Sequence, residues 1–274
     1  MTDEAHQPTP QPAGDLGTAS SQARVQFVGT GPGDPNLLTL GAVDAINRAQ
    51  VIVISCAEHR MLLGSDFLGL RPDVRIVLAG GVDEEAAVLP SQPGTGAPTP
   101  VDVDEHCADV TATVIDAASQ GLEVVRLVSG DPFLDGDIGA EAAAVARADY
   151  DVDVVPGVTG MTAVPEYAGL TLHGHDVQLI GDAACQRDIA GHGSNWSDQG
   201  LVVVNTEAGK LKEVVKHAIE SGRGEDEPAA LICHGATTQQ TTHTVTLGEL
   251  PQTAKTARLG DAEPVPVAVG GVVG

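Results

Sequence analysis

Glycine-rich turns are the segments of this 274-residue sequence whose residue types could build a ligand site. The first is residues 29–34 (GTGPGD), which directly follow the apolar residues 25–28. Glycines let the backbone turn sharply and approach a ligand without a Cβ clash. The turn lacks the Gly-Lys-Ser/Thr ending of a P-loop, and Asp34 stands where the dinucleotide fingerprint has its third glycine. A carboxylate there favours a neutral or cationic ligand over phosphate; a purely structural turn is the alternative.

Three further turns share this character. They are residues 129–133 (SGDPF), 156–159 (PGVT) and 234–239 (HGATTQ), and each follows an apolar run. Gly130 permits close approach, and Asp131 can accept a hydrogen bond from an amine or a hydroxyl. Taken alone, each segment is also typical of an ordinary turn. Because ligands in open α/β sheets bind at the carboxyl ends of strands, the four turns together predict one shared cleft.

Other residues with reactive or metal-binding side chains give weaker signals. His173 and His175 could form half of a metal site, but the sequence offers no third ligand near them, so exposed histidines are the simpler interpretation. The four cysteines are widely dispersed: Cys56, Cys107, Cys185 and Cys233. Such spacing is typical of free thiols in a reducing compartment. We therefore expect no metal site.

The composition excludes several function classes. The chain has 14 Lys and Arg against 38 Asp and Glu, a formal net charge of −24. Nucleic acid and an anionic membrane surface both need a surplus of positive charge, so neither is an expected partner. Hydrophobic residues make up 42%, which is enough for a folded core. The sequence has no apolar run approaching the ~20 residues of a spanning helix, and no secretory signal is apparent, which favours a cytoplasmic location.

The elements that must position the turns divide the chain into three parts. Residues 1–24 are rich in Pro, Gln and Ser and predict a disordered tail. Residues 25–155 predict an N-terminal α/β domain, and residues 156–274 a C-terminal α/β domain. Within the first, residues 79–104 form a long acidic, proline-rich loop. A loop of that length is either functional, such as a lid, or disordered.

Hydrophobic patterning places the elements within the two domains. Strands are predicted at residues 25–28, 51–54, 124–128, 152–155, 177–180, 201–204, 229–233, 245–247 and 265–269. Helical spacing predicts helices at 37–49, 110–120, 140–148, 162–167, 211–221 and 252–259. Continuous β-branched runs are typical of parallel strands that are buried on both faces.

Taken in order, the four turns and their flanks resemble the tetrapyrrole methylase family. Residues 28–40 are similar to that family's opening signature, and residues 125–133 to its second. Residues 154–170 are similar to the third signature, and residues 228–238 to the last. The resemblance covers essentially all of residues 25–274.

The resemblance implies a two-domain α/β fold with a mostly parallel N-terminal sheet, a mixed C-terminal sheet and a cofactor cleft between them. It implies a homodimer that uses S-adenosylmethionine and releases S-adenosylhomocysteine. The reaction implied is C-methylation of uroporphyrinogen III to precorrin-2, on the way to sirohaem or cobalamin. By position, the implied cofactor-binding residues are Pro32, Ser129, Gly130, Asp131, Leu134, Thr159, Gly160, Thr206 and Gly235.

The sequence departs from the family pattern where catalysis is expected. Ser55 occupies the position of an Asp to which a general-base role is assigned, and Cys56 that of the adjacent Arg. A serine hydroxyl is no base at neutral pH without an activating partner. Glu58 and His59 lie nearby and are candidate substitutes. Ser129 stands where the family has a glycine.

Further departures concern the binding of a polycarboxylate substrate, which calls for Arg and Lys. Asp135 and Asp137 replace the Phe and Arg of the family pattern. The remaining cations that could gather substrate are Arg60, Arg126, Arg147 and Arg187. Two alternatives to the enzyme therefore remain. One is a catalytically degenerate module that binds S-adenosylmethionine or a partner, as a scaffold or regulator linked to uroporphyrinogen-III synthase. The other is a sister methylase acting on another corrinoid precursor.

Overall fold

The computed structural model describes residues 23–80, 105–107, 109–136, 138–271 and 273. Most of the expected tail at 1–24 and most of the expected loop at 79–104 lie outside these residues. Two of their boundaries change. Arg24 begins the first strand rather than ending the tail, and Ala79 ends a strand rather than beginning the loop.

The first sheet has six strands, all parallel, in the order β4-β3-β2-β5-β1-β6. Their bounds are β1 (Arg24–Gly29), β2 (Val51–Ile54), β3 (Arg75–Ala79), β4 (Glu105–Cys107), β5 (Val124–Val128) and β6 (Asp151–Val155). The β-branched runs of β2 and β5 are buried at every position, as expected for strands covered on both faces. In this order β5 lies between β2 and β1 in the sheet interior. From β1 the chain builds the sheet in one direction through β2, β3 and β4, and it then returns to add β5 and, on the other side of β1, β6, so the edge near β1 and β5 is a topological switch point.

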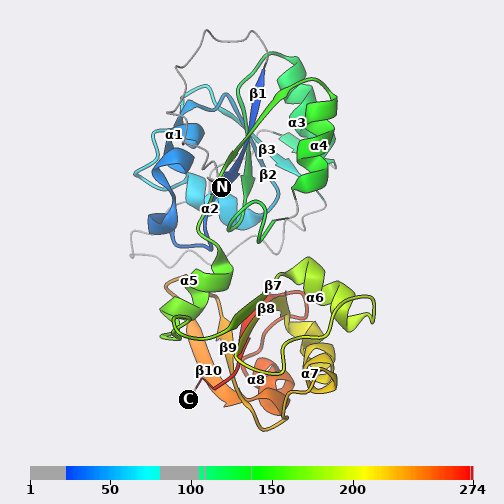
Figure 1. Ribbon diagram of the computed structural model, residues 1–274. Helices are drawn as coiled ribbons and strands as arrows, with labels where there is room; N and C mark the ends of the chain where they lie inside the picture. The colour runs from blue at the N-terminus through cyan, green and yellow to red at the C-terminus, as the bar shows by residue number, and fades with distance from the viewer. Residues whose placement is uncertain (1–22, 81–104, 108, 137, 272, 274) are drawn as a thin grey trace, which may run out of the picture.

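Helices cover both faces of this sheet, as Figure 1 shows. They are α1 (Leu40–Arg48), α2 (Ala57–Leu63), α3 (Val110–Ser119) and α4 (Gly139–Arg147). Ile46 of α1 and Leu63 of α2 pack on one face with Leu127. Val114 of α3 and Val145 of α4 pack on the opposite face. The result is a three-layer α/β/α arrangement.

The second sheet is mixed and has five strands in the order β10-β9-β11-β8-β7. Its strands are β7 (Val177–Ile180), β8 (Leu201–Glu207), β9 (Pro228–Cys233), β10 (Thr241–Thr246) and β11 (Pro264–Val269). Only β7 and β8 pair in parallel; the other pairs are antiparallel. The mostly parallel first sheet and the mixed second sheet confirm the fold class that the sequence indicated.

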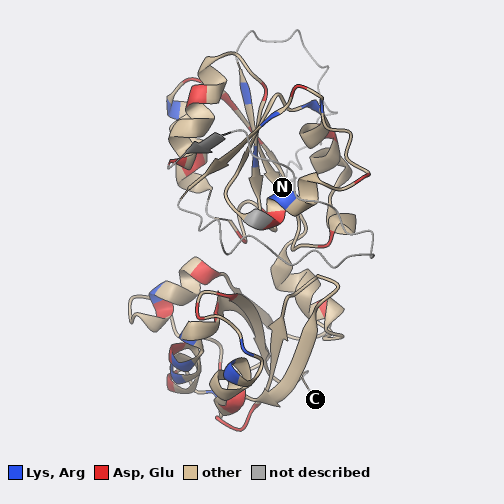
Figure 2. Cartoon of the chain, turned by 180° about the vertical axis from the view of Figure 1, so that it is seen from behind, with Lys and Arg blue, Asp and Glu red and all other residues tan. Residues whose placement is uncertain are grey.

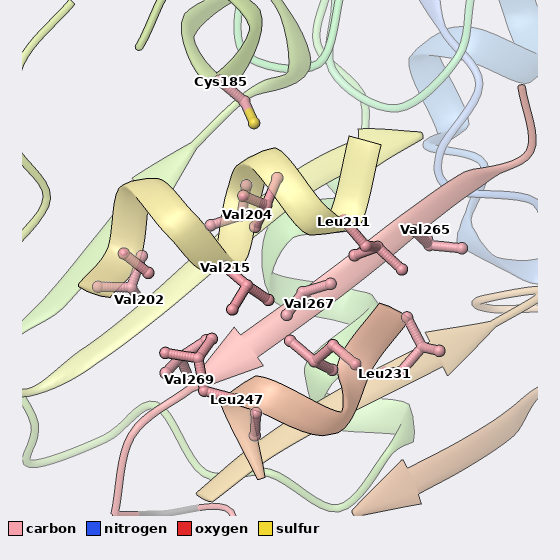
Figure 3. Packing of buried hydrophobic residues seen from close by; sticks show 14 of the residues in the cluster. Cys185, Val202, Val204, Leu211, Val215, Leu231, Leu247, Val265, Val267 and Val269 are labelled. Carbon is pink, nitrogen blue, oxygen red and sulfur yellow. The ribbon is translucent and has the colours of Figure 1, made fainter. Parts of the chain in front are cut away.

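Four helices accompany the second sheet: α5 (Gly160–Tyr167), α6 (Asp182–Ile189), α7 (Leu211–Glu220) and α8 (Leu250–Thr256). Short 3₁₀ turns occur at Pro35–Leu37, Ala208–Lys210 and Leu247–Glu249. Figure 3 shows how Leu211 and Val215 of α7 pack against Val204, Val267 and Leu231 of the strands. Packing α6, α7 and α8 on one face leaves the other face to α5 and its flanking chain.

Several predicted elements change in the structure. The helix expected at 37–49 is a 3₁₀ turn followed by α1, because Thr39 caps α1 by accepting a hydrogen bond from the Ala42 N–H. The elements α2, β3, β4 and α6 were not predicted. The sheet changes between β6 and β7, a stretch that includes the proposed domain boundary at 155/156. None of the helices within the described residues is long and apolar enough to cross a membrane.

Candidate functional site

Three predicted turns meet where the neighbouring strands β5, β1 and β6 end. Gly29 ends β1, and Gly130 and Gly157 follow β5 and β6. A Cβ added to Gly157 would lie 2.1 Å from the carbonyl oxygen of Gly130, and one added to Gly29 would lie 2.5 Å from the Gly157 nitrogen. Backbone atoms cannot move aside as a flexible side chain could, so these positions require glycine.

Backbone hydrogen bonds join the turns after β1 and β5 into one unit. Gly130 N donates to Gly31 O at 2.8 Å, and Gly31 N donates to Gly130 O at 3.3 Å. Thr30 N donates to Val128 O at 2.9 Å. Gly31 and Gly130 both have positive φ, at 75° and 67°, which glycine adopts without the Cβ penalty. The two turns therefore form a rigid, narrow backbone edge.

Asp131 and Asp135 organise the turn after β5. The Asp131 Oδ1 accepts hydrogen bonds from the N–H groups of Phe133 and Leu134. The side chain of Leu134 is exposed. Its carbonyl oxygen faces Gly181, the residue that precedes α6: a Cβ added to Gly181 would lie 3.3 Å from that oxygen. The other Asp131 oxygen has no partner among the described residues and can accept from a ligand.

Asp135 connects the turn after β5 to the start of α5. Its Oδ2 accepts from Asp131 N at 2.7 Å and from Gly160 N at 3.3 Å. Its Oδ1 accepts from the Thr159 hydroxyl at 2.9 Å. Burial raises the pKa of Asp135 above its usual value, although these hydrogen bonds act in the opposite direction. Asp135 therefore acts as a brace that brings Asp131, Thr159 and Gly160 together.

Residues of α5 and of the turn after β9 approach the first turn. A Cβ on Gly33 would lie 3.5 Å from the Ala236 carbonyl oxygen and 3.7 Å from that of Gly235. A Cβ on Gly160 would lie 3.4 Å from the Cβ of Pro32. The structure thus brings together Pro32, Gly160 and Gly235, three of the residues that the sequence proposed for the cofactor.

One further contact of the first turn and the backbone of the fourth turn extend this arrangement. The Tyr167 hydroxyl donates to Asp34 Oδ2 at 3.0 Å and so ties α5 to the first turn. Burial opposes ionisation of Asp34, but hydrogen bonds from Asn36 and Tyr167 outweigh it and hold its pKa below the usual value.

In the fourth turn, His234 and Ala236 have φ values of 50° and 55°, a conformation that costs free energy for residues with a Cβ.

Thr206 lies elsewhere. It is on β8, 2% exposed, and follows Val202 and Val204 on the face that α6 and α7 cover. Its hydroxyl oxygen has no hydrogen-bond partner among the described residues. The structure thus gives no contact that joins Thr206 to the glycine turns, and its role in cofactor binding stays a prediction.

His59 is one of the two proposed substitute bases, and its environment makes it a weak one. It is 2% exposed, and its Nε2 lies 3.3 Å from both Thr30 Oγ1 and Ser129 Oγ. Burial, with a smaller effect from the Arg126 charge, lowers the pKa of His59 to about 3. The ring is therefore neutral at physiological pH and has little tendency to take up a proton.

The other catalytic candidates follow β2. Ser55 and Cys56 are half-buried and Glu58 is exposed on α2. The Cys56 Sγ lies 3.7 Å from Ser129 Oγ. Burial, reinforced by the Glu58 charge, raises the pKa of Cys56 to about 11, so the thiol is protonated and poorly nucleophilic. Of this group, Glu58 is the accessible carboxylate.

Two of the four cations expected to gather substrate, Arg126 and Arg147, are unsuited to that role. Arg126 is 6% exposed, and its Nε donates to Glu141 Oε2 at 3.2 Å, so its charge is already paired. Arg147 lies at the end of α4 that leads into the amino end of β6, opposite the glycine turns. Figure 2 shows basic residues on the helices that accompany the second sheet, and they include Arg187, Lys212, Lys216 and Lys255.

No group of three or more His, Cys, Asp or Glu side chains within the described ranges is arranged to hold a metal ion. Asp137 lies outside those ranges.

Comparisons with known proteins agree with this fold and these motifs. Residues 24–251 match the family described as Tetrapyrrole (Corrin/Porphyrin) Methylases. A uroporphyrinogen-III C-methyltransferase of Sinorhizobium sp is 31% identical over 263 residues, which are 93% of this chain and 85% of that protein. A siroheme synthase of Methylococcus capsulatus is 33% identical over 259 residues, which are 91% of this chain and 49% of that protein. The chain thus spans about half the length of that synthase.

Solved structures share the fold. A cobalt precorrin-4 methyltransferase of cobalamin biosynthesis superposes with a TM-score of 0.69 at 19% identity, covering 95% of this chain and 100% of that one. A uroporphyrin-III C-methyltransferase from Thermus thermophilus, complexed with S-adenosylhomocysteine, gives 0.59 at 23% identity, covering 92% and 99%. The family that these comparisons identify uses S-adenosylmethionine. From the match over residues 24–251 and the 31% identical relative, the chain belongs to the tetrapyrrole methylase family.

Proposed function

We propose that this chain is an S-adenosylmethionine-dependent C-methyltransferase that converts uroporphyrinogen III to precorrin-2. One observation carries the proposal: the turns at Gly29, Gly130 and Gly157 touch one another, and Gly33 of the first of these turns lies against the Ala236 and Gly235 carbonyls of the turn after β9. The relatives named as uroporphyrinogen-III C-methyltransferase and siroheme synthase support this substrate. The product would enter sirohaem or cobalamin synthesis.

The residues present suit the proposed cofactor. S-adenosylmethionine carries an ammonium group, a carboxylate and a ribose, and when bound it supplies an electrophilic methyl group. The partner-free oxygen of Asp131 can accept from the ammonium group or a ribose hydroxyl. Glycines at 130 and 157 let the turns after β5 and β6 pack against each other and against Asp135, which holds the cofactor edge in place. An acidic site also favours a sulfonium cation over an anion.

For the proton that must leave the methylated macrocycle, Glu58 is the better of the two candidate bases. Ser55 lacks a carboxylate, and the pKa of His59 falls to about 3 because the ring is buried. Glu58 is exposed on α2, just beyond the strand end at which the family places its carboxylate. We propose that it accepts this proton.

A second candidate function rests on the departures from the family pattern. Cys56 places a thiol, which cannot carry a positive charge, where the family has an Arg, and Arg126 is buried against Glu141, so neither residue supplies a free positive charge for a polycarboxylate. These observations favour a module that binds S-adenosylmethionine without turnover, as a scaffold beside uroporphyrinogen-III synthase. A sister methylase acting on a less anionic corrinoid precursor would also suit them.

The deciding experiment is anaerobic transfer of a labelled methyl group from S-adenosylmethionine to uroporphyrinogen III by the purified protein. We expect label in precorrin-2, and we expect Glu58→Gln to lose turnover while still binding S-adenosylhomocysteine in calorimetry. Glu213→Gln, an exposed position on α7, is the matched control and should keep full activity. Cofactor binding without label transfer would favour the scaffold or the sister methylase.

The assembly and the location of the protein are part of the same proposal. We expect a homodimer in the cytoplasm. Light scattering on the eluting protein distinguishes a dimer from a monomer of 27.9 kDa.

A further inference from the structure

Two residues that follow separate strands contact the buried ring of His59, and a third contacts one of these two residues. His59 Nε2 lies 3.3 Å from Thr30 Oγ1, after β1, and 3.3 Å from Ser129 Oγ, after β5. Cys56, after β2, has its Sγ 3.7 Å from the same Ser129 oxygen. Cys56 and Ser129 both depart from the family pattern, so two departures are in direct contact. The cluster lies directly beneath the turns proposed to hold the cofactor.

The direction of each hydrogen bond follows from counting protons. The Thr30 hydroxyl has one proton, and the nearer of its two carbonyl acceptors is Val128 O at 3.1 Å. Once that proton is given to a carbonyl, Thr30 Oγ1 can meet His59 only as an acceptor. His59 must then carry its proton on Nε2 and donate it.

The other ring nitrogen supports the same tautomer. His59 Nδ1 is buried and has no hydrogen-bond partner among the described residues. An orphaned buried N–H is rarer and costlier than an under-satisfied acceptor, so the proton is better placed on Nε2. The ring is neutral, so it has only this one proton to give.

This arrangement leaves the Ser129 hydroxyl proton available. Thr30 Oγ1 and Ser129 Oγ lie at the same distance, 3.3 Å, from His59 Nε2, so the two oxygens share its one proton as a bifurcated hydrogen bond and Ser129 Oγ is an acceptor. The nearby Cys56 sulfur is only a weak acceptor for the Ser129 hydroxyl proton. Ser129 is exposed, whereas His59 is buried. Ser129 also directly precedes Gly130 and Asp131, at the edge proposed to contact the cofactor. The hydroxyl can therefore donate outward to a ligand.

We propose that His59 is a positioning residue of the cofactor site, whose Nε2–H fixes the Ser129 oxygen so that its hydroxyl donates to the carboxylate of the bound cofactor. The inference rests on the proposed function, since it needs a bound S-adenosyl ligand. The added Ser129 donor would strengthen cofactor binding in this chain compared with the glycine of the family pattern.

The test measures the Kd of S-adenosylhomocysteine by calorimetry. Ser129→Ala should raise the Kd by roughly ten- to a hundredfold through loss of one hydrogen bond to a charged group. His59→Leu should raise it by a similar factor. The double variant should be no weaker than the worse single variant, because both substitutions remove the same interaction. His59→Gln, which retains a side-chain N–H, should stay within about threefold of the parent.

Controls separate positioning from general stability. Ser119→Ala removes an exposed hydroxyl at the end of α3 and should leave the Kd unchanged. Thermal unfolding of each variant shows whether it is folded; Ser129 is exposed, so its Ala variant tests the inference even if His59→Leu fails to fold. Unchanged Kd values for Ser129→Ala, additive effects in the double variant, or a His59→Gln as weak as His59→Leu would overturn the inference. A parent protein that binds no S-adenosylhomocysteine would overturn the proposed function as well.

Discussion

The Cα of Gly157 lies so close to the carbonyl oxygen of Gly130 that a Cβ between them would be 2.1 Å from that oxygen. The two glycines follow β6 and β5, strands that both pair with β1. The contact therefore runs across the end of β1 and fixes the separation of the turns on either side of it. The cofactor edge can have this shape only because residues 130 and 157 are glycines, which have no Cβ atom.

Gly157→Ala should accordingly damage both the fold and cofactor binding. Forcing a methyl group against backbone atoms costs about 1–3 kcal/mol or more. Urea unfolding and calorimetric titration with S-adenosylhomocysteine measure the two effects. Gly260→Ala is the control, because a Cβ there would meet nothing within 4 Å. Wild-type stability and affinity in Gly157→Ala would contradict the described geometry.

Asp135 should make stability depend on pH. Burial raises its pKa above the usual value for an aspartate, so the native state binds this proton more tightly than the unfolded state does. That contribution is fully present below the unfolded pKa and is lost as pH rises through the folded pKa. As the pH rises from about 4 to about 7, the free energy of unfolding should therefore decrease less in Asp135→Asn than in the parent protein. Denaturant titrations across this range test the sign, and a steeper loss in the variant would contradict it.

The net charge of −24 should act against a polyanionic substrate. Salt screens repulsion between like charges, so the KM for uroporphyrinogen III should fall severalfold as NaCl rises from about 50 to about 300 mM. The KM for S-adenosylmethionine, a cation at the sulfonium, should rise slightly or stay constant in the same titration. A tetrapyrrole KM that increases with salt would indicate a cationic substrate site instead.

Cys56 should resist alkylation in the native protein. Burial raises its pKa to about 11, so the thiolate is on the order of one part in a thousand at pH 8. Mass spectrometry after iodoacetamide treatment should find Cys56 unmodified in the native state and modified in urea. Rapid native modification at pH 8 would show that the thiol is more exposed or more acidic than its contacts with Ser129 and His59 indicate.

Arg258→Gly should stabilise the protein. Arg258 is exposed after α8 and has a φ of 61°, in the left-handed region. Replacing it with glycine removes the Cβ penalty there, and the greater freedom of the unfolded chain offsets part of the gain, which leaves about 0.5–1 kcal/mol. Thermal unfolding should show a higher Tm. A lower Tm would mean that the Arg258 side chain makes a stabilising contact.

Local patterning was enough to predict the glycine turns and all strands except β3 and β4. Val124–Val128 and Val177–Ile180 begin and end as predicted, because apolar runs bounded by polar residues or glycine identify a buried strand. The 3₁₀ start before α1 was missed. So was α6, because Asp182–Ile189 is largely polar and only Cys185 and Asp188 are buried. Periodicity gives little signal in such a helix.

The side-chain contacts of the site could not be predicted in this way. Tyr167 meets Asp34 across 133 positions, and Ser129 meets His59 across 70. No local pattern encodes which distant side chains will face one another. Arg126 illustrates the same limit, since its sequence position suggested a free cation and the fold buries it against Glu141. The sequence did flag Ser129 as a departure, but not its partner.

The placement of β1 inside the first sheet also sets an order of synthesis. Val25 pairs with Val124 and Val152, so neither neighbour of β1 exists until roughly a hundred residues later. At about 5–20 residues per second on the ribosome, β1 waits roughly 5–20 s for a hydrogen-bonding partner. During that time its apolar residues are a target for chaperones or for misfolding. We therefore expect the first sheet to complete its pairing around β1 late, whereas the parallel pair β7 and β8 of the second sheet follow each other directly along the chain.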